Sequence, residues 1–197
     1  MEIFLNGNKL DAEIEHEKTL HEVLVFFEKE CMKNDATIVQ IEVNGTVIPA
    51  GELDTIFNTP LPEVQKLAIS TVCEKDIVKS IKNLAVQLTT ICEGLEQISV
   101  KYQTNNDNEV SAIITSFANS FDSLCHLISL TALFPTKFSH FKIDDMTIIE
   151  FLQDFSPILE EFETALKEKD TVLVGDLAEY EIMPRLTNLI ASIQKIE

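Results

Sequence analysis

The sequence predicts an α+β protein in which a small sheet domain precedes an antiparallel helical bundle of three to four helices. Two observations support this. Apolar residues alternate with a period of two up to about residue 72, the spacing of half-buried strands. From about residue 77 they recur every three or four residues, the spacing of amphipathic helices. We therefore expect two domains, residues 1–72 and residues 73–197.

Strand and turn signals alternate through the first domain. Two Asn-Gly pairs, at residues 6–7 and 44–45, favour tight hairpin turns because both residues tolerate a positive φ angle. Thr19 and Glu22 have the spacing of a helix N-terminal capping box, which predicts a helix that ends near Met32. The expected strands are residues 2–5, 9–14, 38–43, 46–48 and 65–72, with a short irregular or helical stretch near residues 52–57.

The resulting order, β-β-α-β-β-β, is that of the β-grasp, or ubiquitin-like, fold. Within it, the hairpin Val43–Pro49 resembles that of the small sulfur-carrier proteins of thiamin and molybdopterin synthesis, and Met1–Gly7 and Thr19–Leu24 are similar to the same family. The resemblance covers about the first 72 residues and implies a β-grasp domain. Members of that family act through a free C-terminal Gly-Gly. Here the last strand runs into Cys73 and a long helical region, and the chain ends in Glu197. Sulfur-carrier-related activity is therefore only a secondary alternative, because this sequence lacks the Gly-Gly tail that such activity requires.

Four amphipathic runs fill the second domain. Their apolar positions span residues 77–98, 110–128, 148–166 and 173–196, and short polar loops separate them. Such runs pack as an antiparallel bundle. Pro157 and Pro184 lie inside the third and fourth runs, where the missing backbone N–H should kink or split a helix.

The chain is strongly acidic. Its 33 acidic and 15 basic residues give a net charge of −18, shared between residues 1–72 (−8) and residues 73–197 (−10). Neither nucleic acid nor an anionic membrane suits such a surface, because both require clustered Lys and Arg. The acidity indicates either solubility alone or a basic protein partner. No signal peptide or membrane span is expected, and four scattered cysteines favour reduced thiols in the cytoplasm.

Motifs for catalysis or cofactor binding are not found in the sequence. The one Glu-x-x-His pair, Glu13 and His16, lies in a predicted strand and turn, and the five glycines are too scattered for a phosphate loop. Cys92 and Cys125 are expected to be buried thiols beside core positions, since zinc needs three or four ligands. We therefore predict no catalytic residue, no metal and no cofactor.

Two clusters are candidates for binding a partner. Asp176, Glu179 and Glu181 form an acidic patch around Tyr180, which is either a solvated face or a docking surface for a basic partner. Three aromatic residues near Pro135 either close the end of the bundle core or form an exposed apolar contact; they are Phe134, Phe138 and Phe141. The segment Asp170–Leu186 also faintly resembles uncharacterised bacterial proteins.

The predicted function is that of a non-enzymatic interaction protein, an acidic adaptor or chaperone-like molecule. Small acidic cytoplasmic chaperones of secreted or flagellar subunits share this composition. The expected partner is a protein that is basic or presents an amphipathic helix. The alternative is an enzyme whose site lies at the domain junction and uses scattered Asp, Glu or His residues. The oligomeric state is left open.

Overall fold

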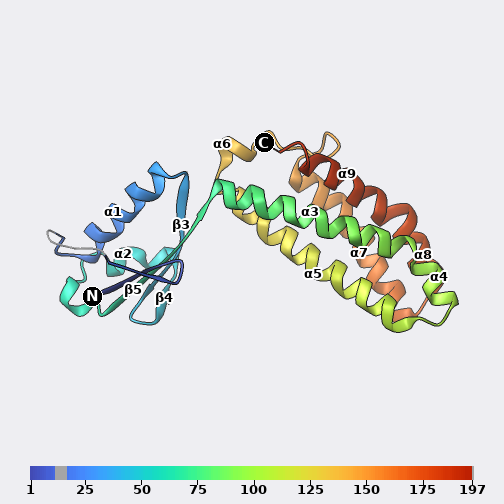
Figure 1. The fold of residues 1–197 in the computed structure, drawn as a ribbon, viewed down its shortest axis with the longest axis horizontal. Helices are drawn as coiled ribbons and strands as arrows, with labels where there is room; N and C mark the ends of the chain where they lie inside the picture. The colour runs from blue at the N-terminus through green and yellow to red at the C-terminus, as the bar shows by residue number, and fades with distance from the viewer. Residues whose placement is uncertain (12–16, 197) are drawn as a thin grey trace. The chain divides into compact units, whose positions relative to one another are not determined.

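The computed structural model describes residues 1–11 and 17–196, and the chain divides into two compact units, Met1–Asp76 and Ile77–Glu197 (Figure 1). The first unit contains a five-stranded sheet and the second consists mostly of helices, so the predicted α+β class is confirmed. The Glu13 and His16 pair, and the end of the predicted second strand, lie outside the described residues.

The sheet of the first unit has the strand order β2-β1-β5-β3-β4. Its strands are β1 (Glu2–Leu5), β2 (Asn8–Leu10), β3 (Ala36–Val43), β4 (Thr46–Ile48) and β5 (Lys66–Cys73). Strands β1 and β5 are parallel, with Ile3 opposite Leu67, and the other pairs are antiparallel. The central strand β5, which comes last in the sequence, therefore joins the two N-terminal strands to β3 and β4.

One long helix, α1 (Leu20–Lys33), packs against this sheet (Figure 1). The predicted capping box is present: the Thr19 side chain accepts from the Glu22 backbone N–H, and the Glu22 carboxylate accepts from the Thr19 backbone N–H. The apolar stripe of α1 faces the strands, because its residues share a buried cluster with sheet residues such as Leu67. These helix residues are Leu20, Val23, Leu24 and Phe27. A short 3₁₀ turn (Ala50–Glu52), the helix α2 (Leu53–Ile56) and a second 3₁₀ turn (Leu61–Glu63) connect β4 to β5.

Both Asn-Gly turns do more than reverse the chain. Asn6 and Asn44 have φ angles of 49° and 52°, as a tight hairpin requires. The Asn44 side-chain oxygen also accepts from the backbone N–H groups of Gln65 (2.8 Å) and Lys66 (3.0 Å), and its Nδ2 donates to the Glu63 carbonyl (3.1 Å). The Asn6 side chain binds the backbone N–H (2.7 Å) and Oγ1 (3.0 Å) of Thr71. The Asn44 side chain thus binds the start of β5, and the Asn6 side chain binds Thr71 near its end.

Strand β5 is followed directly by the first helix of the second unit, α3 (Glu74–Glu96). The backbone N–H of Glu74 donates to the Asp35 carbonyl at 3.1 Å. The last strand of the sheet therefore continues directly into a long helix.

The second unit is built from long helices joined by short elements (Figure 1). The long helices after α3 are α5 (Asp107–Thr131), α7 (Ile148–Glu168) and α9 (Met183–Ile193), and the shorter elements are α4 (Ile98–Gln103), α6 (Pro135–Phe138), α8 (Thr171–Asp176) and a π-helix (Leu177–Ile182).

Side-chain contacts define how these helices pack. Gly94 of α3 faces Ile113 of α5, because a Cβ at Gly94 would lie 3.1 Å from that side chain. The rings of Phe117 (α5) and Phe162 (α7) meet edge to face at 6.3 Å. A Cβ at Gly175 of α8 would lie only 2.2 Å from the Ser99 Oγ of α4. Small residues therefore allow close backbone approach at two helix pairs.

The two internal prolines have different outcomes. Helix α7 continues through Pro157 from its capped start at Thr147, so this proline does not split it. Pro184 lies in the first turn of α9, which continues without a break from the preceding π-helix. The π-helix that precedes it widens the turn that the proline ring would otherwise meet. The fourth run is therefore one helical segment, α8–π–α9, with a local widening rather than a break.

Candidate functional site

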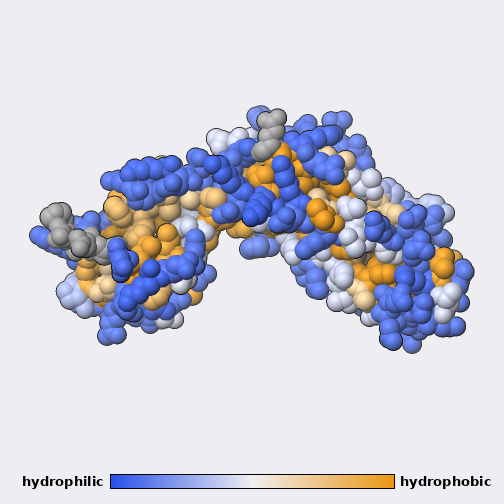
Figure 2. All heavy atoms as spheres, in the orientation of Figure 1, coloured by the Kyte–Doolittle hydropathy of each residue, from blue (hydrophilic) through white to orange (hydrophobic). Residues whose placement is uncertain are grey.

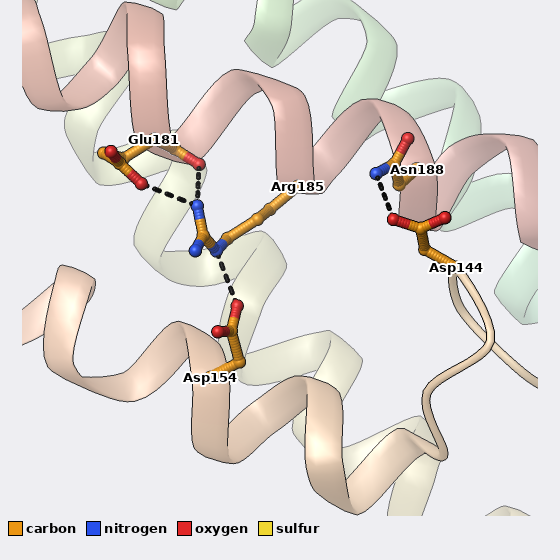
Figure 3. Close-up of polar contacts among 5 residues, drawn as sticks. All are labelled: Asp144, Asp154, Glu181, Arg185 and Asn188. Atoms are coloured by element: carbon orange, nitrogen blue, oxygen red, sulfur yellow. Dashed lines mark hydrogen bonds and ion pairs between the residues drawn. The ribbon is translucent and has the colours of Figure 1, made fainter.

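The only arginine of the chain, Arg185, joins α9 to α7 (Figure 3). Its Nε donates to the Asp154 carboxylate at 2.8 Å. Its Nη1 donates to the Glu181 carboxylate at 2.8 Å and to the Glu181 backbone carbonyl at 3.0 Å. The arginine side chain is 24% exposed and the two carboxylates are 44% and 46% exposed. The cluster is therefore a clamp at the edge of the bundle, partly screened by water.

A turn beside this clamp carries a second polar contact. Asn188 of α9 donates through Nδ2 to the Asp144 carboxylate at 3.2 Å (Figure 3). Asp144 and Asp145 have φ angles of 50° and 65°, between Ile143 and Met146, which exchange backbone hydrogen bonds of 2.9 and 3.0 Å. Two successive left-handed residues make a type I′ turn, and non-glycine residues there cost about 1–2 kcal/mol each. A cavity of about 220 Å³ adjoins both the turn and the Arg185 contacts, and Asp144, Asp154, Arg185 and Asn188 are among the residues that line it.

The predicted acidic patch divides into two parts. Asp176, Glu179 and Tyr180 are exposed, and Tyr180 has 65% of its surface exposed. A hydrogen bond to Glu179, followed by the negative charges of Glu179 and Asp176, raises the pKa of the Tyr180 hydroxyl. Asp176 lies three residues before Glu179 and four before Tyr180, spacings that place side chains near one another on a helix. Glu181 is half-buried, and its carboxylate accepts a hydrogen bond from Arg185 of α9, so within the described part of the chain it is paired with a cation, unlike the other three residues.

The net negative charge of the second unit is carried by one stretch of its sequence, residues 144–186. Residues 144–186, which include α7, α8 and the π-helix, contain twelve acidic and three basic residues, a formal charge of −9. The rest of residues 77–197 contains six of each and is formally neutral. The charge that repels anions and attracts basic segments is thus carried by one part of the helical unit.

Two exposed side chains with apolar surface, Val172 and Tyr180, are close in sequence to the exposed carboxylates of Asp176 and Glu179. Val172 of α8 is 72% exposed and lies four residues before Asp176, so both share one face of the helix. Tyr180 follows within the next turn. We call Val172, Asp176, Glu179 and Tyr180 the acidic stripe. It combines negative charge with exposed apolar surface, which suits a segment that is both basic and amphipathic.

The three aromatic residues near Pro135 have different environments. Phe138 of α6 is buried, and Phe134 and Phe141 are half-buried. Phe138 and Phe141 line a cavity of about 590 Å³. The basic side chains Lys137, His140, Lys142 and Lys195 lie around it, together with Asp144 and Asp145. Phe138 therefore belongs to the core, whereas Phe134 and Phe141 are partly accessible.

Sequence reasoning missed Asp154, Arg185 and Asn188. The Glu181 and Arg185 pair could have been recognised, because an acid four residues before a base is a favourable helical spacing. Asp154 and Asp144 lie on elements far away in the sequence, and no local pattern signals their contacts with α9.

Within the described residues, no group of three or more His, Cys, Asp or Glu side chains could hold a metal ion. Cys31 is buried and Cys92 is half-buried, but Cys125 is exposed, contrary to its expected burial. Burial raises the pKa of the Cys92 thiol, with a smaller contribution from the charge of Glu93. Among the same residues, no helix has the length and apolar character that crossing a membrane requires.

Comparison with known proteins places the helical unit in a family. Residues 79–192 match the family described as domain of unknown function DUF8042, and residues 1–73 match the family described as TP0873 N-terminal domain. The chain belongs to the DUF8042 family. A protein of Treponema pallidum (strain Nichols), named "Uncharacterized protein", is 32% identical over 189 residues, which cover 96% of this chain and 94% of the relative. No solved structure matches.

The two family matches thus divide this DUF8042 member close to the point where β5 gives way to α3. The residues of the Arg185 clamp and the acidic stripe all lie inside the matched range 79–192. The descriptions of both families name neither a reaction nor a partner.

Proposed function

We propose that this chain is a non-enzymatic cytoplasmic adaptor or chaperone-like protein whose helical unit binds a basic, amphipathic helical segment of a protein partner. The observation that carries the proposal is the charge distribution: residues 144–186 hold a charge of −9, whereas the remainder of the helical unit is neutral. Four free cysteines support a reducing compartment.

The proposed contact is the acidic stripe. Asp176 and Glu179 supply negative charge, and Val172 and Tyr180 supply exposed apolar surface. A basic amphipathic helix presents the complementary surface, with lysines or arginines flanking leucine-like residues. Arg185 pairs with both Asp154 and Glu181, and its contact with Asp154 joins α9 to α7, so we assign these two carboxylates to the packing of the unit and not to the proposed contact.

A defined peptide tests the proposal. The probe is a fluorescein-labelled two-heptad helix with leucine at the core positions and lysine elsewhere, and the readout is fluorescence anisotropy with the full-length chain. We compare Asp176→Asn combined with Glu179→Gln to a matched pair outside the acidic part, Glu93→Gln combined with Asp122→Asn. Each lost exposed ion pair is worth about 0.2–1 kcal/mol, so the first double variant should raise Kd by about 2- to 30-fold. The control pair should leave Kd near the wild-type value.

Tyr180→Ala is a separate test of the apolar part of the stripe. This variant should raise the Kd of the peptide even at high salt, because an apolar contact with Tyr180 is not screened by ions. Equal losses in the two charge-neutralised pairs would mean that the peptide responds to net charge alone. That result would overturn the acidic stripe as the binding surface.

We further propose that the first unit is a β-grasp domain. The support is the order β2-β1-β5-β3-β4, with β1 and β5 parallel and α1 packed against the sheet. The test is an NMR measurement on the full-length chain. Cross-strand contacts between Ile3 and Leu67, and between Ile41 and Ile69, are expected, and an antiparallel β1–β5 pairing would refute the assignment.

A further inference from the structure

One edge of the sheet is only half covered. Strand β3 pairs with β5 along its length, but β4 pairs only with its second half, Ile41–Val43. Within the described residues, Ala36–Gln40 have no strand partner on the side away from β5. The register shift between Ile38 and Gln40 leaves Val39 as an extra residue at this edge, and 45% of its surface is exposed. Unpaired N–H and C=O groups of an edge strand are a template for another extended segment.

An apolar groove adjoins this open edge. It has a volume of about 430 Å³ and lies between α1 and β3, with Leu53 and Phe57 also lining it. Leu24 and Met32 come from the helix and Ile38 from the strand. Met32 is 72% exposed, although its thioether side chain lies beside other apolar groups. Figure 2 shows apolar side chains gathered on the visible face of this unit, over the region of α1 and β3.

The groove has one acidic side chain among its lining residues, Glu28. Among the described residues Glu28 forms no ion pair, whereas Glu30 on the same helix is paired with Lys33. Asp35 immediately precedes the open edge and is exposed. Residues 1–76 contain fifteen acidic and six basic residues, so the surroundings also favour a positively charged occupant.

We propose that the open edge of β3 and the adjoining groove bind an extended peptide strand with alternating apolar side chains and a basic residue on the same face. Its backbone continues the sheet beyond Ala36–Gln40, its apolar side chains enter the groove, and its basic residue meets Glu28. Strand addition of this kind combines main-chain hydrogen bonds with pockets for alternate side chains. The proposal concerns the first unit alone and goes beyond helix binding by the acidic stripe.

The test uses a labelled nine-residue peptide that alternates threonine with valine and carries lysine at the last position of the valine face. Binding to the full-length chain is measured by anisotropy, and backbone amide hydrogen exchange is followed by NMR. Binding should slow exchange in Ala36–Gln40. A proline at the central valine should abolish binding, because it removes a backbone N–H and cannot continue a ladder.

Charge and groove variants have matched controls in the same unit. Glu28→Lys should raise Kd about fivefold, whereas Glu63→Lys, an exposed charge reversal away from the groove, should not. Met32→Glu should weaken binding, and Val47→Glu, at an exposed apolar residue of β4, should leave it intact. These four variants lie at solvent-accessible side chains, so folding can be verified by an unchanged NMR spectrum elsewhere.

Three results would overturn the proposal. One is peptide binding without protection of Ala36–Gln40, and another is equal binding by the Glu28→Lys and Glu63→Lys variants. The third is a concentration-dependent dimer, seen by light scattering, with the same amides protected in the absence of peptide. That outcome would make a second copy of the chain the occupant of the edge.

Discussion

The side chain of Asn44 should be a major source of stability for the sheet unit. It makes three hydrogen bonds, two accepted from Gln65 and Lys66 and one donated to Glu63, at distances of 2.8–3.1 Å. Because its φ angle is 52°, replacement by alanine would confuse backbone strain with lost hydrogen bonds. Asn44→Gly retains the turn geometry and removes only the side-chain contacts.

The expected cost follows from the number of bonds. A typical hydrogen bond contributes about 0.5–1.5 kcal/mol net, and the site is exposed, so Asn44→Gly should lose about 1–3 kcal/mol of unfolding free energy. Asn44→Asp retains the two accepted bonds and should lose less. Asn6→Gly removes two bonds and should fall between them.

The assay is urea unfolding followed by NMR signals of the sheet unit, such as the amide of Ile69 in β5. Gly51 has no atom near its missing Cβ and an ordinary φ angle, so Gly51→Ala is a control for general effects of substitution. An Asn44→Gly variant as stable as wild type would refute the reasoning, because the side-chain bonds to the β5 entry would then contribute nothing.

Three further predictions concern the helical unit. Gly175→Ala should lower the unfolding free energy of this unit by about 1 kcal/mol, because the new Cβ would lie 2.2 Å from the Ser99 Oγ. In a Ser99→Ala background the same change should be neutral or stabilising. Additive effects of the two substitutions in urea unfolding would exclude the close α4–α8 contact. Arg185→Met should cost about 1 kcal/mol by leaving Asp154 and Glu181 without their cation, and the loss should shrink at high salt; a salt-independent loss would point to packing instead. Thr147→Val should cost about 1 kcal/mol at neutral pH through loss of the α7 cap. Hydrogen bonds from the Thr147 backbone and hydroxyl lower the pKa of Glu150, so the stability that they contribute is present above the unfolded-state pKa and is lost as pH falls through the folded-state pKa. The difference in Tm between wild type and Thr147→Val should therefore narrow on acidification. A difference that stays constant with pH would contradict this.

Much of the architecture could be predicted from local sequence. The capping box at Thr19 and Glu22 determines where α1 begins, since both partners lie within one turn. The Asn-Gly pairs determine the turns because few other residue pairs adopt the φ angles that a two-residue hairpin needs. The acidic stripe was partly predicted as well, since Asp176, Glu179 and Tyr180 are close neighbours in sequence.

Other features were decided only by tertiary structure. Asn44 was recognisable as a turn residue, but its bonds to Gln65 and Lys66 depend on β5 arriving beside the hairpin after two further turns. Asp154 meets Arg185 only because α7 and α9 pack together, and the open edge of β3 exists only because β4 is shorter than β3. Periodicity and capping act within a few residues, so the sequence can specify elements and turns. Contacts between distant segments depend on how the folded elements pack, and these contacts create both the Arg185 clamp and the groove beside β3.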